Sequence, residues 1–302
     1  MTMRSVRTSL LPVTCVVFLV LAATSCPLGQ NAKVRVLLAG DSGALLAAKS
    51  ATDGQVVQKA GELTLDEIAS LKITVTEVSL DRSGPVTAEG EGEGEGEGEG
   101  ESEGERVVVF TGEKEVDIRD LTGISELLSQ SSVSAGHYTK VRLAIKDPKL
   151  ILTADPETVI TDVQLTANGH LFVSESFDLP DGQTSLVLLD FEGIHVVETG
   201  NGKYVWTPQL RARISVEPAQ AVVTGTISAV DTSTSKLTVD VSESSQPVDV
   251  DYSSADIFLP TDTDTPSGTA DDLVVDATIT VEGTLSVSGP LHADTIRLGS
   301  SI

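Results

Sequence analysis

The chain has 302 residues, a length that accommodates two domains. Hydrophobic residues make up 40% of it, enough to supply a core, but only 3% of the residues are aromatic and the formal net charge is −25. A chain this acidic has no basic patch that would displace counterions from nucleic acid, so we exclude a nucleic-acid partner. Short stretches rich in Val, Ile and Thr, separated by Gly, Pro, Asp and Ser, favour an all-β fold.

The first 26 residues have the pattern of an export signal. Arg4 and Arg7 form a short basic region, residues 10–23 form an apolar run, and small residues then lead to Cys26. The apolar run is shorter than the roughly 20 residues that span a bilayer. The pattern resembles a bacterial lipoprotein signal, in which residues 1–25 are removed and Cys26 becomes the lipidated first residue. An ordinary secretory signal next to an incidental cysteine is the alternative.

The same resemblance implies a location. Pro27, where an inner-membrane lipoprotein would have Asp, implies sorting to the outer membrane, with residues 26–33 as a tether. The other cysteine, Cys15, lies in the segment that is removed, so the mature chain cannot form an internal disulfide. Packing and hydrogen bonds must then stabilise the exported domain.

The first part of the mature chain predicts strands at residues 34–39 and 71–80. Between them, Thr64 and Glu67 have the spacing of a helix capping box, which predicts one short helical turn. Residues 89–105 follow as an alternation of Glu and Gly broken once by Ser102. Because this segment has no apolar side chain, we expect a disordered loop at the tip of a hairpin whose second strand begins at residue 106. Weak calcium binding by this loop is the alternative.

The strand at residues 135–146, AGHYTKVRLAIK, is central to the predicted fold. Val141, Leu143 and Ile145 occupy one face and Lys140, Arg142 and Lys146 the other, as in a half-buried strand. Before it, residues 116–128 are expected to start extended and to end in a helical turn. After it, short strands alternate with turn residues up to residue 216, which indicates an antiparallel β-sandwich. Residues 185–191, SLVLLDF, are apolar on both faces, so we expect this strand to be covered on both sides.

Three motifs carry a family resemblance: GHYTKVRLAI, SLVLLDFEG and YVWTPQLRARI. Together they resemble an uncharacterised β-domain family of bacterial and archaeal lipoproteins, over residues 34–216. The family has an Asp-Ala-Pro turn near its start, where this chain has Gly40-Asp41-Ser42. The resemblance implies a fold and a location, and it implies no catalytic residue.

Pro218 marks a boundary, after which residues 222–302 follow a different pattern. Gly225 and Gly283 lie inside predicted strands, as at bulges or tight barrel corners. This part resembles a second uncharacterised family of small β-barrels appended to secreted bacterial proteins. We expect it to fold as a separate unit.

The sequence contains few signals of chemistry. The four histidines, His137, His170, His195 and His292, have no metal-ligand spacing. Asp262 and Asp264 invite a calcium interpretation, but Pro266 and Ser267 stand where an EF-hand needs an oxygen ligand and a glycine.

Three aromatic residues are candidates for a sugar-binding platform. Tyr138, Tyr204 and Trp206 would stack on a sugar if exposed, and a core or sheet-edge role for Trp206 is the alternative. We expect no catalytic residue, no cofactor and no metal.

The sequence therefore predicts a non-enzymatic lipoprotein of the cell envelope that serves as a structural or binding module. It is anchored to the membrane through lipid on Cys26 and meets a glycan or protein ligand at the cell surface. A carbohydrate-binding or adhesin module is the alternative function. Catalysis is a third hypothesis, which lacks a visible nucleophile-base or metal constellation.

The lipid anchor can be tested by substitution. Cys26→Ser should leave the protein unprocessed or release it from the membrane fraction, because the acyl chains are added to the thiol. Fractionation followed by immunoblotting measures the outcome. A processed Cys26→Ser protein that stays in the membrane fraction would show that another segment is the anchor.

Overall fold

A computed structural model describes residues 31–40, 61–83, 105–242 and 245–299. The predicted signal segment 1–25, the lipidation site Cys26 and the Glu-Gly run up to residue 104 lie outside the described residues. Within them the long elements are all strands and no α-helix occurs, so the predicted all-β fold class is confirmed. None of the described elements is a helix long and apolar enough to cross a membrane.

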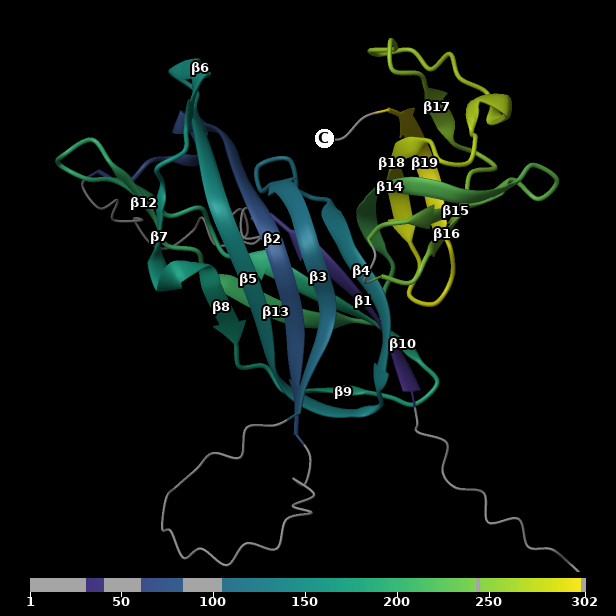
Figure 1. Ribbon diagram of the computed structural model, residues 1–302, viewed down its shortest axis with the longest axis horizontal. Coiled ribbons are helices and arrows are strands. Elements are labelled where there is room, and N and C mark those ends of the chain that lie inside the picture. Colours follow the sequence, from purple (N-terminus) through teal and green to yellow (C-terminus); the bar gives the residue numbers. More distant parts are fainter. Residues whose placement is uncertain (1–30, 41–60, 84–104, 243–244, 300–302) are drawn as a thin grey trace, which may run out of the picture.

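Two sheets pack face to face (Figure 1). The back sheet contains, in order, β13 (Leu210–Ser215), β10 (Thr184–Phe191), β1 (Asn31–Ala39) and β4 (Ser125–Ser134). The front sheet contains, in order, β3 (Glu105–Asp117), β2 (Ile68–Arg82), β5 (Gly136–Leu152) and β6 (Asp155–Ile160). Two short strands, β8 (His170–Val173) and β9 (Phe177–Leu179), also pair with β5. Buried side chains from both sheets, such as Val36 and Leu80, form the core between them.

Smaller elements close one end of the sandwich. A third sheet contains β11 (Val196–Glu198), β12 (Tyr204–Trp206) and β7 (Gln164–Leu165). The 3-10 turns are η1 (Leu65–Glu67) and η2 (Thr166–Gly169) in the sandwich part and η3 (Ala270–Asp272) in the barrel part. At η1 the backbone N–H of Thr64 donates to Glu67 Oε2 at 2.7 Å, which confirms the predicted capping interaction.

The predicted central strand is confirmed and is longer than expected. Val141, Leu143 and Ile145 of β5 are buried, while Arg142 faces outward. On either side of the Glu-Gly run, β2 and β3 pair antiparallel, as predicted for a hairpin. Glu105, expected to end the loop, is already the first residue of β3.

The back sheet is mixed rather than wholly antiparallel, contrary to prediction. β1 pairs in parallel with β10, from Lys33 opposite Thr184 onward, and antiparallel with β4. Between β1 and β10 the chain builds the front sheet, and such a long crossover allows a parallel return. β1 also begins at Asn31, inside the predicted tether, because Ala32 is already buried in the core.

The helical turn expected at the end of residues 116–128 is also wrong. Residues 118–123 form a turn, and Ser125 then begins β4. Leu127 and Leu128 are both fully buried, but they belong to different cores on opposite faces of the sheet. Such two-sided burial suits a strand between two layers.

The C-terminal part is a small five-stranded barrel. It is closed by β14 (Ala219–Asp231), β15 (Lys236–Asp240), β16 (Val248–Asp251), β19 (Leu291–Leu298) and β18 (Thr278–Leu285), each paired with the next and β18 with β14. A further strand, β17 (Asp256–Phe258), pairs with β19. A Cβ on Gly283 would lie 2.1 Å from the His292 carbonyl oxygen, and one on Gly225 would lie 2.3 Å from that of Asp240. Glycine is therefore required at both predicted strand positions.

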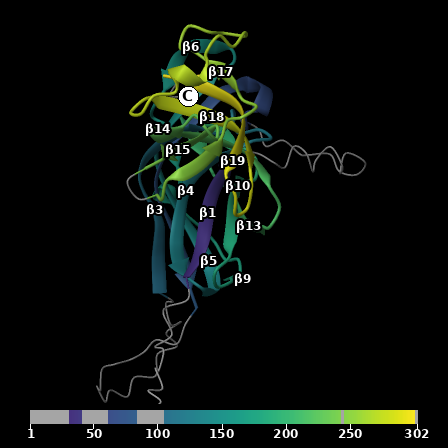
Figure 2. The same ribbon diagram turned by 90° about the vertical axis from the view of Figure 1, so that its right-hand side faces the viewer.

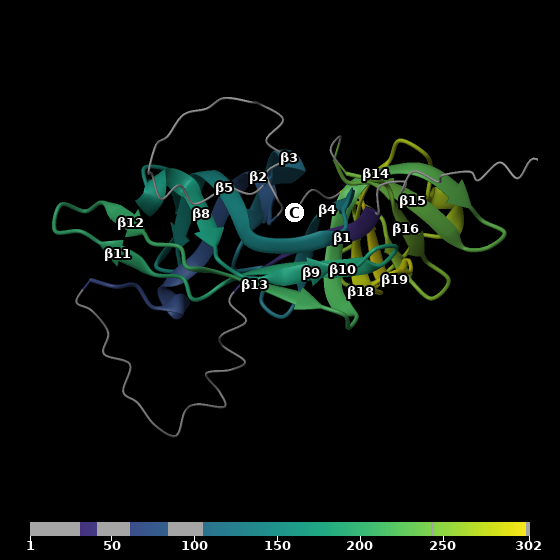
Figure 3. The ribbon, with the colours of Figure 1, turned by 90° about the horizontal axis from the view of Figure 1, so that it is seen from below.

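The barrel is joined to the back sheet at one edge. β4 pairs in parallel with β14, so the back sheet continues into the barrel wall, and Figures 2 and 3 show the barrel against the end of the sandwich. Leu37, Leu127 and Leu186, from β1, β4 and β10, pack with the buried side chains of the barrel. This explains the predicted double covering of residues 185–191, which is confirmed. Independent folding of residues 222–302 stays a prediction.

The shared core predicts a stability effect that reaches the barrel. Leu186→Ala should lower the free energy of unfolding by about 2–5 kcal/mol, because it leaves a cavity in a fully buried site. Amide hydrogen exchange in β14 should accelerate together with exchange in β10. The control Val159→Ala, at a side chain that is 49% exposed, should change stability by less than about 0.5 kcal/mol. Unchanged exchange in β14 would mean that the barrel does not depend on this contact.

Candidate functional site

A cavity of about 620 Å³ lies where the sandwich meets the barrel, and we call it the cleft. On the sandwich side it is lined by the end of β3, the following turn and the start of β4. On the barrel side it is lined by β14, β18 and β19. The cleft therefore exists only because the barrel is docked on the back sheet.

Strand register explains which side chains reach the cleft. Glu126 of β4 lies opposite Val222 of β14, which in turn lies opposite Glu282 of β18. The adjacent row across the barrel strands contains Thr224, Thr280 and Arg297. Because alternate residues share a face, the inner face of the back sheet continues as the outer wall of the barrel.

The composition of the cleft combines apolar surface with an excess of negative charge. Its apolar side chains are those of Val116, Leu121, Ile124 and Val222. Its acidic residues are Glu113, Glu115, Asp117, Asp120, Glu126 and Glu282, and its basic residues are Lys114 and Arg297. An uncharged or positively charged ligand is therefore favoured over an anion.

The innermost polar group is an ion pair between the two sheets. Lys114 Nζ lies 2.6 Å from Glu126 Oε1, and the two side chains are 18% and 6% exposed. Lys114 also donates to the carbonyl oxygen of Thr224 at 3.4 Å, so it links β3, β4 and the barrel. Burial raises the pKa of Glu126, whereas Lys114 and Thr224 oppose that shift.

Three of the other carboxylates are engaged within the protein. Glu113 Oε1 lies 2.5 Å from Lys146 Nζ, and Glu115 pairs with Lys149. Asp117 accepts a hydrogen bond from the backbone N–H of Leu71 at 3.1 Å. These groups are held in place by internal partners.

Two carboxylates differ from the others. Within the described residues, neither Asp120 on the turn after β3 nor Glu282 on β18 makes an ion pair. Burial raises the pKa of Asp120 and the negative charge of Asp117 raises it further, whereas the charges of Lys72 and Arg119 oppose that shift. The sandwich and barrel walls of the cleft thus each carry a carboxylate without a paired cation.

The other face of the back sheet fixes the barrel through Arg35 of β1. Its Nε donates to Gln130 Oε1 at 2.6 Å, and its Nη2 donates to the carbonyl oxygen of Gly289 at 2.8 Å. Its Nη1 donates to the carbonyl oxygen of Ser286. Burial lowers the pKa of this guanidinium, and Asp249 opposes that shift. Arg35 therefore holds the β18–β19 loop against the sandwich.

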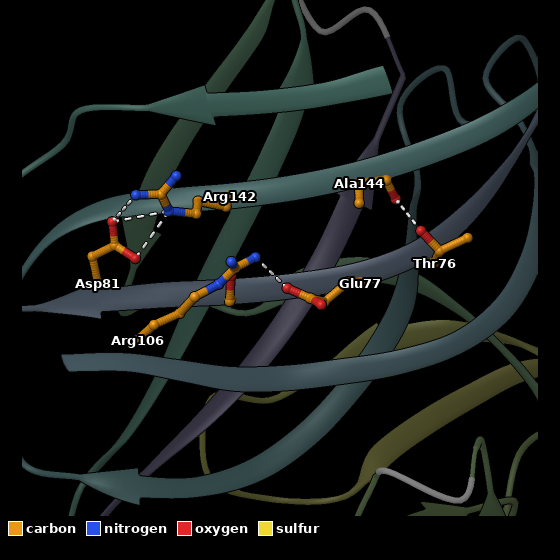
Figure 4. A network of polar contacts seen from close by, with 7 residues as sticks. Thr76, Glu77, Asp81, Arg106, Arg142 and Ala144 are labelled. Carbon is orange, nitrogen blue, oxygen red and sulfur yellow. Dashed lines mark hydrogen bonds and ion pairs between the residues drawn. The ribbon is translucent and has the colours of Figure 1, made fainter. Parts of the chain in front are cut away.

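The exposed face of the front sheet is a grid of ion pairs (Figure 4). Arg142 Nη2 lies 2.8 Å from Asp81 Oδ2, and Arg106 Nη2 lies 2.5 Å from Glu77 Oε1. Next to this grid, Phe172 is 64% exposed, with Lys140 Nζ 5.4 Å from its ring centroid. The predicted outward face of β5 thus carries charged side chains that form ion pairs, and one exposed aromatic ring lies next to them.

Most sequence-based candidate residues have structural roles. Trp206 is fully buried, which confirms its core role. Tyr138 is also fully buried, and its hydroxyl donates to the carbonyl oxygen of Ser134 at 2.7 Å. Asp262 accepts hydrogen bonds from the backbone N–H groups of Leu259 and Ser267, so its carboxylate holds its own loop. Cys26 lies outside the described residues.

The histidines are dispersed. His137 lies 2.9 Å from Asp178, His195 lies 2.8 Å from Glu62, and His292 lies 3.8 Å from Asp251. His170 is exposed on β8. Across the described ranges, no group of three or more His, Cys, Asp or Glu residues is placed to hold a metal ion.

Sequence reasoning missed the cleft. Lys114 is one of many charged residues on β3, and Glu126 was expected in a helical turn. The one available signal was a charged residue in the apolar stretch ISELL, and its partner could not be read from the sequence.

Comparison with known proteins gives one match. A family model described as "Domain of unknown function (DUF4382)" matches residues 56–208. No curated protein and no solved structure matches the chain. The matched range begins after β1 and ends before β13, although both strands belong to the back sheet.

Removing the buried cation of Lys114 should lower the free energy of unfolding by an amount that depends on pH. Lys114→Met should lower the free energy of unfolding by about 3–5 kcal/mol at pH 7.5, because Glu126 becomes an unpaired buried charge. The raised pKa of Glu126 means that its carboxylate protonates as pH falls, so the difference from wild type should shrink at pH 5. Urea unfolding at both pH values measures it.

The exposed pair Lys149–Glu115 provides the control. Lys149→Met should cost less than about 1 kcal/mol at either pH, as is usual for surface ion pairs. A pH-independent loss for Lys114→Met would show that the packing of its side chain matters more than its charge.

Proposed function

Because the chain belongs to the DUF4382 family, whose function is unknown, we propose its role from its own geometry: a non-enzymatic, lipid-anchored binding module of the cell envelope. The observation that carries this proposal is the cleft between sandwich and barrel. The lipid anchor is proposed at Cys26 from the signal pattern of residues 1–26, and the outer membrane from Pro27.

The size of the cleft suits a small ligand. A volume of about 620 Å³ falls within the range of roughly 300–1,000 Å³ typical of small-molecule sites. Such sites combine apolar lining with a few placed polar groups. In the cleft these are the apolar side chains around Val116 and Val222, with carboxylates on both walls.

The charges select a cation. Asp120 and Glu282 lie on different walls and are not paired, so each can accept an ammonium group. A short aliphatic diamine or the side chain of a basic peptide fits this combination of apolar stem and cationic ends.

Binding is favoured over catalysis by the state of four of the six carboxylates that line the cleft. Glu113, Glu115 and Asp117 hold internal partners, and Glu126 is paired with Lys114. A general acid-base pair needs groups that are free to exchange protons with a bound substrate. The exposed ring of Phe172 supports the alternative role, a carbohydrate-binding or adhesin module, and a glycan array distinguishes the two.

A matched pair of probes tests the proposal. Hexamethylenediamine should bind the detergent-solubilised full chain in calorimetry, while hexanediol, of the same length without charge, should not. Asp120→Asn and Glu282→Gln should each weaken diamine binding about tenfold, equal to about 1.4 kcal/mol. Added salt should also weaken it, because these carboxylates are partly solvated.

Glu157→Gln is the matched control, since Glu157 is an exposed residue of β6 outside the cleft. It should leave the affinity unchanged. Equal weakening by all three variants, or equal binding of both probes, would remove the cleft as the site.

A further inference from the structure

Lys114 is the one basic side chain of the cleft that reaches between the two sheets. It starts on edge strand β3, meets Glu126 of β4 at 2.6 Å and donates to the Thr224 carbonyl of β14. Glu126 has only 6% of its side chain exposed, whereas Lys114 keeps 18%. Both side chains line the cleft, and that of Glu126 is the more enclosed of the two.

The charges around Glu126 come from every element that borders the cleft. They are Lys114, Glu113 and Glu115 on β3, Asp117 and Asp120 on the turn, Glu282 on β18 and Arg297 on β19. Among them, Lys114 alone is within ion-pairing distance of Glu126. While the pair is intact its two charges cancel, so Asp120, Glu282 and Arg297 set the charge available to a ligand.

On the premise of the proposed cation-binding function, we infer that Glu126 is a proton-controlled switch of the cleft. When Glu126 takes up one proton from solvent, Lys114 loses its counter-ion. Its long side chain then turns its ammonium group into the cleft, where Asp120 and Glu282 attract it. A bound organic cation is displaced, so acidification releases the ligand.

The change is local because other contacts hold the barrel. Leu37, Leu127 and Leu186 stay in the shared core, and Arg35 holds the β18–β19 loop. Burial also raises the pKa of Glu126, so the proton is taken up above the usual range of a glutamate. The pKa of Asp120 is raised as well, so Asp120 also loses charge on acidification. The test must therefore distinguish the effect of protonating Asp120 from that of protonating Glu126.

The experiment measures hexamethylenediamine binding to the full chain at pH 7.5 and pH 5. Glu126→Gln mimics the protonated state and should bind about tenfold more weakly at pH 7.5, since one uncompensated positive charge then lies beside the ligand. The double variant Lys114→Met/Glu126→Gln removes that charge and should restore affinity at pH 7.5. The variant Asp120→Asn should bind the diamine weakly at pH 7.5, and its affinity should fall further at pH 5 because Glu126 is still present.

A second measurement needs no ligand. The carbon resonance next to the Lys114 ammonium group, followed by NMR from pH 7.5 to pH 5, should shift as Glu126 protonates and stay constant in Glu126→Gln. A constant resonance in the wild-type chain overturns the switch, as does wild-type affinity in Glu126→Gln. If the diamine binds at neither pH, the proposed function fails. The NMR resonance alone then shows whether protonation of Glu126 moves Lys114.

Discussion

The parallel pairing of β4 with β14 is the constraint on which the rest of the structure depends. Two residue pairs, Ser125 with Ala221 and Glu126 with Val222, extend the back sheet into the barrel wall. This junction gives the outer face of the back sheet a covering layer, so that Leu37, Leu127 and Leu186 are fully buried. It also brings the inner face of the back sheet next to the outer wall of the barrel, which creates the cleft.

The apolar and polar contacts at this junction have different consequences. Leucines on the barrel-facing side add stability in proportion to the apolar area they remove from water. The Lys114–Glu126 pair on the opposite side gains little net stability, because desolvation of both charges offsets their attraction. A buried pair that adds little stability is open to other uses, and our proposal assigns it the control of a ligand. Arg35 is a third case: its guanidinium is buried like the ion pair, but it donates hydrogen bonds to backbone carbonyl groups of the barrel loop.

The sequence contained most of the strand pattern and little of its connectivity. The alternation in residues 135–146 and the double-sided apolar pattern of residues 185–191 led directly to β5 and to a buried β10. The same pattern could not show that β1 runs parallel to β10, because period-two alternation is identical for both strand directions. Nor could it show the cleft, since Glu126 and Lys114 meet only after two sheets pack. For the same reason the segment before Leu127 was predicted to be helical, because local propensity contains no information about the barrel that covers this strand.

The position of β1 has a consequence for the order of events during biosynthesis. The first strand of the described chain lies in the middle of its sheet, where Val34 faces Ser131 on one side and Ser185 on the other. Both partners are synthesised long after β1, and contacts between such distant segments form slowly. The back sheet cannot be completed before β10 has been made, so β1 waits for its parallel partner until residues 184–191 have been synthesised. For the proposed export route, this delay would keep the polypeptide competent for translocation until it has crossed the membrane.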